Sequence, residues 1–221
     1  MRTDNTILDL YAIIVIVVLL VSCIVQRRLN KKISIYLIGW MIVHMLMLCC
    51  DVARWKFRGK IEALSLFTVM FILEFVLGYI CLCFFHYYFI DYMKEYVEIN
   101  LRWRLIVWPV TIIMSGLWVL SRYNRMFYVI TYNAVNVPNK GYYLSQLPAM
   151  LVIMLDMFFV FWHRHKIGWR NVLVMWLYMI FSIDCISPAV CMGRRGIVYW
   201  HVIITADTIC LYQFRTEQIT C

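Results

Sequence analysis

Residues 63–90 read ALSLFTVMFILEFVLGYICLCFFHYYFI, and this stretch decides the fold class. Glu74 is the only Asp, Glu, Lys or Arg within it. A helix needs about 20 predominantly apolar residues to cross the hydrocarbon core of a bilayer. The stretch exceeds that length, and the excess is accommodated by helix tilt or by projection from the bilayer. The sequence therefore predicts a transmembrane helix here.

Six further apolar segments flank this one along the chain. They are residues 7–25, 33–50, 105–120, 143–162, 172–190 and 197–214. The first of them lacks both the basic start and the cleavage site of a signal peptide, so we expect a retained helix. Together the segments predict an all-α fold: a polytopic integral membrane protein, with seven transmembrane helices forming a single domain over residues 1–221.

The composition supports a membrane protein and excludes two other classes. Apolar and aromatic residues make up 64% of the 221 residues, charged residues 15%, and the mean hydropathy is +0.78. A typical soluble domain has about 25% charged residues, so a soluble globular enzyme is excluded. Disorder requires low hydrophobicity and is excluded too. The net charge of +9 belongs to Lys and Arg between the apolar segments, which indicates lipid contact rather than nucleic acid.

Motifs for enzymatic, metal or cofactor chemistry are missing from the sequence. Most of the nine cysteines lie inside apolar segments without zinc spacing, which predicts buried thiols. A disulfide between Cys49 or Cys50 and Cys191 is the alternative. The sequence contains no HExxH, GxSxG or phosphate-binding loop, and residues 197–214 have no Lys for a retinal Schiff base. We predict a protein that is not an enzyme and that binds neither a metal nor a cofactor.

The distribution of positive charge does not orient the chain. Seven helices put the two termini on opposite sides. Side one has the loops after the first, third and fifth helices and the C-terminus; side two has the remaining loops and the N-terminus. Side one carries eleven Lys and Arg and side two carries ten. The early basic cluster of residues 27–32 favours a cytoplasmic side one.

Ionisable residues inside the apolar segments are the candidates for function, because they are costly in a membrane. Depth along the helices groups four of them in the half of the bundle nearer side two, with Asp51 at its edge. The predicted ligand-binding residues are His44, Asp51, Glu74, Asp184 and His201. Asp207 lies near the middle, and His86 and Asp156 lie toward side one. The alternative is that each group pairs with another helix for packing.

The same side predicts the kind of ligand. Its ten basic residues outnumber its acids, and an electropositive mouth attracts an anionic small molecule. Anionic lipid headgroups of the bilayer are the alternative partner. Pro188 follows Asp184 by about one helical turn, so a kink there is a candidate lever for a conformational signal.

The order of several short motifs resembles a known family. These motifs are residues 51–60 (DVARWKFRGK), 89–93 (FIDYM), 127–130 (FYVI), 140–143 (KGYY), Pro188, residues 193–196 (GRRG) and residues 211–220 (LYQFRTEQIT). Together they resemble the seven-helix N-terminal sensory region of bacterial, Clostridia-type diguanylate cyclases. Seven-helix inputs of histidine kinases are similar. The resemblance covers nearly the whole chain, but the catalytic GGDEF domain is absent.

The resemblance implies an orientation and a role. Output domains of the family are cytoplasmic, which implies the bacterial inner membrane with the N-terminus outside and the C-terminus in the cytoplasm. It also implies signal transmission through the last helix, involving Pro188, Asp207, Arg215 and Glu217, to a cytoplasmic partner or within a homodimer. We therefore expect a sensory or receptor input module for signal transduction. The alternatives are a small solute transporter or substrate-capture subunit, and an assembly protein.

Overall fold

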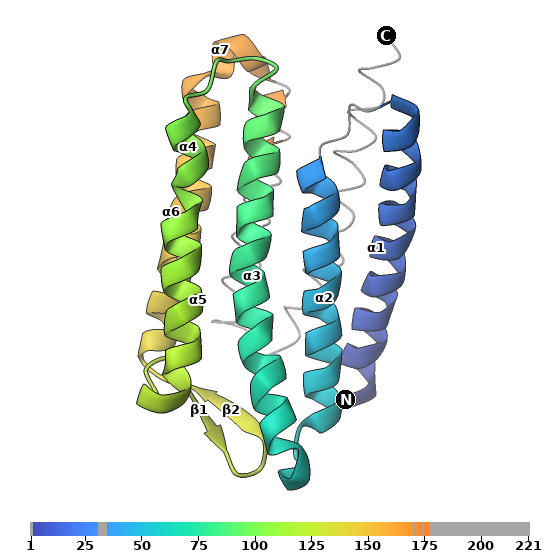
Figure 1. Ribbon diagram of the computed structural model, residues 1–221, viewed down its shortest axis with the longest axis vertical. Coiled ribbons are helices and arrows are strands. Elements are labelled where there is room, and N and C mark those ends of the chain that lie inside the picture. The colour runs from blue at the N-terminus through green and yellow to red at the C-terminus, as the bar shows by residue number, and fades with distance from the viewer. Residues whose placement is uncertain (1, 31–34, 170, 174, 177–221) are drawn as a thin grey trace.

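Five long helices form a bundle in the computed structural model, which describes residues 2–30, 35–169, 171–173 and 175–176 (Figure 1). The long helices are α1 (Arg2–Asn30), α2 (Ile35–Phe57), α3 (Leu64–Met93), α5 (Val107–Asn124) and α6 (Gly141–Trp162). The short elements are η1 (Ile61–Ala63), α4 (Leu101–Leu105), β1 (Tyr128–Thr131), β2 (Val135–Pro138) and α7 (Arg164–Ile167).

Within the described residues, four helices are long and apolar enough to cross a membrane. They cover Ile35–Phe57, Ile61–Met93, Arg102–Asn124 and Gly141–Trp162. The apolar part of α1, Leu10–Val25, is shorter. A predominantly helical membrane protein is thereby confirmed. The predicted sixth segment is described only at residues 172, 173, 175 and 176, which are helical. The predicted seventh segment lies outside the described residues, so the count of seven stays a prediction.

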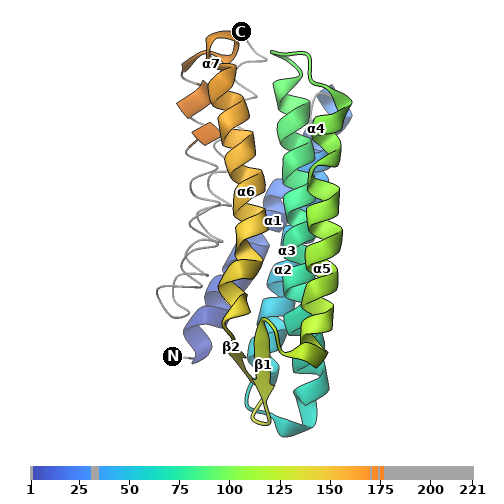
Figure 2. The same cartoon turned by 90° about the vertical axis from the view of Figure 1, so that its left-hand side faces the viewer.

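The helix α3 occupies the centre of the described bundle. It contacts α2, α5 and α6, and α2 in turn contacts α1. The helix α6 contacts both α3 and α5, and Figure 2 shows it in front of the other helices on one side of the bundle. Neighbouring helices run in opposite directions, so their connections gather at two ends. We call them the hairpin end, with η1, β1 and β2, and the α7 end, with α4 and α7. The hairpin end corresponds to side two of the sequence analysis and the α7 end to side one.

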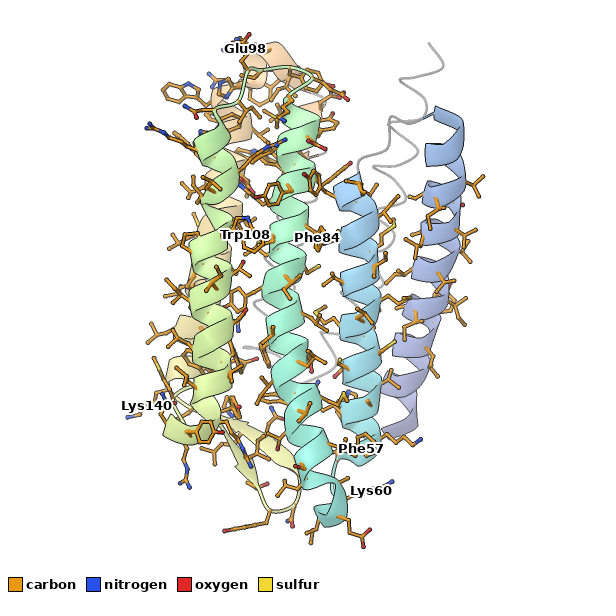
Figure 3. The ribbon with its side chains drawn as sticks, in the orientation of Figure 1. Phe57, Lys60, Phe84, Glu98, Trp108 and Lys140 are labelled. Carbon is orange, nitrogen blue, oxygen red and sulfur yellow. The ribbon has the colours of Figure 1, made fainter. Side chains whose placement is uncertain are left out.

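The helices α2 and α3 approach each other closely at Gly39. A Cβ atom built on Gly39 would lie 2.5 Å from a ring carbon of Phe84, a side chain that Figure 3 shows between the two helices. Small residues allow such close approach in membranes, where packing rather than water exclusion drives helix association. Gly39 therefore sets the distance between α2 and α3.

Six aromatic rings form the core at the hairpin end, and we call them the aromatic cluster. The ring of Trp118, whose side chain is fully buried, stacks on Phe75 at 3.6 Å and on Tyr128 at 5.6 Å between centroids. The other members are Phe71, Phe127 and Tyr142. Aromatic pairs contribute about 0.5–1.5 kcal/mol each beyond their buried area. The cluster therefore joins α3, α5, the hairpin and α6.

The hairpin was not predicted from the sequence, in which residues 121–142 separate two of the apolar segments. Its strands pair antiparallel, with Tyr128 opposite Pro138 and Thr131 opposite Val135. Ala134 takes a left-handed conformation, φ 48°, and its amide donates to the Thr131 carbonyl. The hydroxyl of Ser121 accepts from the Phe127 amide at 2.8 Å, which fixes the hairpin to the end of α5.

Substitution of Gly39 by Ala tests the close approach of α2 and α3. The added methyl group collides with the Phe84 ring, and overpacking of this kind costs about 1–3 kcal/mol. Gly116→Ala is the matched control, because an added Cβ there meets nothing within 4 Å. We expect a lower Tm in detergent for G39A and an equal or higher Tm for G116A, because Ala favours the helix. Equal Tm values for G39A and wild type would contradict the packing described.

Candidate functional site

Arg54 brings together two of the predicted ligand-binding residues, Asp51 and Glu74. Its guanidinium pairs with the Asp51 carboxylate one turn earlier on α2. Its Nε lies 2.8 Å from Oε2 of Glu74 on α3. We call these three residues the Arg54 cluster. Arg54 was predicted to lie in a loop, because the second apolar segment ends at Cys50. The helix α2 continues to Phe57, so Arg54 belongs to the bundle.

The Arg54 cluster is largely removed from solvent. The side chains of Asp51, Arg54 and Glu74 are 5%, 14% and 17% exposed. The guanidinium also lies over the ring of Phe71, 5.8 Å from its centroid. Removing one partner from a buried ion pair leaves an uncompensated charge, which is strongly destabilising. The cluster therefore fixes α2 to α3 and touches the aromatic cluster through Phe71.

Positively charged residues gather at the hairpin end, the end of the bundle where the Arg54 cluster lies. They come from the end of α2, the end of α5 and the start of α6: Lys56, Arg58, Lys60, Arg122, Arg125 and Lys140. Figure 3 labels Lys60 and Lys140 at this end of the bundle and Glu98 at the other. This end would attract anions to the Arg54 cluster.

The remaining predicted site residues lie elsewhere. His44 is buried, and its ring stacks on Trp40 at 5.7 Å between centroids. It precedes Asp51 by seven residues, which is roughly 10 Å along an α-helix, so it lies deeper in the bundle than the Arg54 cluster. Residues outside the described part of the chain include the predicted ligand-binding residues Asp184 and His201 and the predicted transmission residues Pro188, Asp207, Arg215 and Glu217.

A second buried polar cluster lies toward the α7 end, and we call it the His86 cluster. Nδ1 of His86 on α3 lies 3.0 Å from both carboxylate oxygens of Asp156 on α6. Its Nε2 lies 2.8 Å from the main-chain carbonyl of Trp103 on α4. The side chains of His86 and Asp156 are each 1% exposed. Both residues were predicted to lie toward this end of the bundle, but their pairing was not predicted. Each lies a similar number of residues from the side-one end of its apolar segment, and this similarity in depth could have indicated the pair.

Further polar contacts join α3 to α5 and α6 between the two clusters. The hydroxyl of Tyr79 donates to the main-chain carbonyl of Ser145. The hydroxyl of Thr111 donates to the Tyr79 carbonyl at 3.3 Å and lies 2.9 Å from the thiol of Cys83. The described cysteines are free thiols, and all except Cys49 are buried. Cys191, the alternative disulfide partner, lies outside the described residues.

Tyr128 in β1 has a buried hydroxyl without a hydrogen-bond partner among the described residues. Burial against Trp118 and Phe71 raises the pKa of Tyr128 to about 12, and the positive charge of Arg122 opposes this rise. An unpaired buried hydroxyl costs about 1–3 kcal/mol, which the rings around Tyr128 offset through packing.

The fold and these clusters define a helical membrane protein with a buried ionic cluster toward each end of its central helix. No family model, curated protein or solved structure matches the chain.

A double-mutant cycle on Arg54 and Glu74 tests the Arg54 cluster. Arg54→Gln leaves two buried carboxylates facing each other, and we expect a loss of about 3–5 kcal/mol in the free energy of unfolding. Glu74→Gln costs less, because Asp51 still pairs with Arg54. The double variant is less destabilised than the sum of the single variants by about 1 kcal/mol or more. Unfolding by denaturing detergent from mixed micelles measures these differences.

The pair Arg104–Asp91 is the control for this cycle. Its atoms lie 3.2 Å apart, but its side chains are 22% and 31% exposed. Partly exposed pairs contribute about 0–1 kcal/mol, so Arg104→Gln has a small effect on stability. Equal losses for R54Q and R104Q would contradict the special role of the Arg54 cluster.

The Tyr128→Phe variant tests the unpaired hydroxyl. We expect a gain of roughly 1 kcal/mol in the free energy of unfolding, because the variant keeps the ring and removes a buried polar group. Below pH 10, the ordinary pKa of tyrosine, the wild-type hydroxyl keeps its proton in both folded and unfolded chains. From there to about pH 12 the unfolded chain loses the proton first, so stability falls with rising pH. Chemical denaturation over this range should show a shallower fall for Y128F.

Proposed function

We propose that the chain is a membrane-embedded signal-input module in which an anionic ligand competes with Glu74 for Arg54. The observation that carries this proposal is that a single guanidinium holds carboxylates from two different helices, α2 and α3. A ligand carboxylate or phosphate can pair with the guanidinium in place of Glu74, and arginine binds such groups in a bidentate way. Displacement of Glu74 would therefore separate two helices that the cluster now joins.

The surroundings of the cluster support binding of an anion. The basic residues of the hairpin end raise the local concentration of anions. Arg54 keeps its charge at any physiological pH, so it remains available to a new partner. The low exposure of the cluster makes each ion pair there stronger than a pair in water.

The helix α3 supports transmission from this end to the other. His86 follows Glu74 by twelve residues on the same helix, about 18 Å along its axis. A helix that loses an ion pair at one end can shift as a rigid element, so a small displacement there also displaces the side chains at its other end. Loss of the Arg54–Glu74 pair would therefore be felt at the contact between His86 and α4.

The resemblance to sensory regions of diguanylate cyclases supports the same proposal. In that arrangement the hairpin end faces the outside of a bacterial inner membrane and the C-terminus faces the cytoplasm. The signal would pass to an output partner or to a second copy of the chain through Pro188, Asp207, Arg215 and Glu217. The predicted seven helices and this orientation belong to the proposal.

The Glu74→Gln variant tests the proposal in the full chain reconstituted in nanodiscs of a zwitterionic lipid. Without the competing carboxylate, we expect tighter binding of the probe anions acetate and inorganic phosphate by isothermal titration calorimetry, by about tenfold. We also expect faster hydrogen exchange in α4 and residues 94–100, as in wild type with saturating anion. Glu62→Gln is the matched control, because it removes an exposed carboxylate at the same end.

Two results would overturn the proposal. One is that E74Q behaves like E62Q in both anion binding and hydrogen exchange at the α7 end. The other is uptake of the same labelled anions by liposomes that contain the chain alone, which would indicate a transporter.

A further inference from the structure

The His86 cluster fixes the number of protons that it holds. A main-chain carbonyl oxygen only accepts hydrogen bonds, so the contact with Trp103 at 2.8 Å requires a hydrogen on Nε2 of His86. The contact between Nδ1 and the Asp156 carboxylate, at 3.0 Å, requires one more proton on either the nitrogen or the oxygen. The pair therefore holds two protons and is neutral overall, as an ion pair or as imidazole with carboxylic acid.

Loss of one proton from this pair necessarily breaks a contact. A neutral imidazole has one N–H group and one lone pair. If the remaining hydrogen is on Nδ1, the lone pair of Nε2 faces the Trp103 carbonyl and repels it. If it is on Nε2, the lone pair of Nδ1 faces the Asp156 carboxylate. A buried charged carboxylate without a hydrogen-bond donor costs more free energy than a neutral carbonyl without one. The remaining hydrogen therefore stays on Nδ1, and the contact with the Trp103 carbonyl is lost.

The element that this contact holds is short. The helix α4 has five residues, Leu101–Leu105, and is the first turn of the span Arg102–Asn124 that α5 continues. The N–H groups of a first turn have no partner within the helix, so this turn depends on outside contacts. The ring of Trp103 in α4 packs on the ring of Phe159 in α6, with 5.1 Å between centroids, beside the His86 cluster. We infer that the His86–Asp156 pair is a proton-binding site of the bundle, and that release of its proton breaks the contact between Trp103 of α4 and His86 of α3.

Charged and titratable groups on the elements around the pair set the field that it experiences. They are Tyr36 on α2, Tyr87 and Asp91 on α3, Arg102 and Arg104 on α4, and His163, which follows α6. Asp91 and Arg104 pair with each other at 3.2 Å, and His163 lies against the main-chain carbonyl of Phe159. The part of α5 nearest the pair, residues 107–114, has no titratable side chain. None of these groups is as buried as His86 and Asp156.

Nuclear magnetic resonance of the full chain in nanodiscs tests the inference. Chain labelled with [15N]histidine reports the protonation of both His86 ring nitrogens, and fluorotryptophan at Trp103 reports the environment of α4. Assignments come from His86→Gln and Trp103→Phe. In wild type at neutral pH we expect a hydrogen on Nε2 of His86 and a second proton shared between Nδ1 and the Asp156 carboxylate. As the pH rises, one of these two protons is lost with the slope of a single-proton titration, and the Trp103 signal moves at the same pH.

The Asp156→Asn variant distinguishes a proton site from a purely structural pair. The amide of Asn donates to Nδ1 of a neutral His86 and leaves Nε2–H for Trp103, so both contacts persist without a titrating carboxylate. We expect no alkaline movement of the Trp103 signal in D156N. Glu98→Gln, which removes an exposed carboxylate at the α7 end, keeps the wild-type transition. A wild-type transition in D156N, or an unchanged His86 with a moving Trp103 signal in wild type, would overturn the inference.

Discussion

The constraint on which the described bundle depends is that α3 carries ionisable side chains inside an apolar segment. A charge or a polar ring in a membrane requires a partner, and the partners of Glu74 and His86 come from α2, α4 and α6. Each of these polar contacts therefore joins α3 to another helix. Since α3 also contacts α5, the position of this one helix determines how the other described helices are arranged.

Aromatic packing joins further helices at the hairpin end, where the ion pair of Glu74 with Arg54 joins α3 to α2. Between the Arg54 cluster and the hairpin, Trp118 and its neighbouring rings fill the space among α3, α5 and α6. The hairpin contributes Tyr128 to this core, although its hydroxyl has no partner. The loss of a hydrogen bond there is smaller than the gain from burying a large ring between two others. The hairpin is thus a structural cover of the aromatic cluster rather than a simple connection between helices.

The sequence predicts where the long helices lie but not which side chains pair between them. Apolar segments give the position of α2, α3, α5 and α6, because length and hydropathy act locally. The partner of Glu74 was missed because hydropathy ends the second segment at Cys50, whereas the helix continues through Arg54. Basic residues near a helix C-terminus favour that continuation through the helix dipole. The hairpin was missed because Tyr128–Thr131 is too short to show a strand period, and its pairing depends on the rings beneath it.

The two clusters differ in the kind of change that can open them. The guanidinium of Arg54 does not lose its proton, so in the proposed function a competing anion releases Glu74 from it. The imidazole of His86 holds a proton that can leave, and its contacts depend on that proton. Since both clusters hold α3, an anion at one end and a proton at the other would act on the same rigid element. Thermodynamic linkage then requires that each changes the affinity for the other by the same factor.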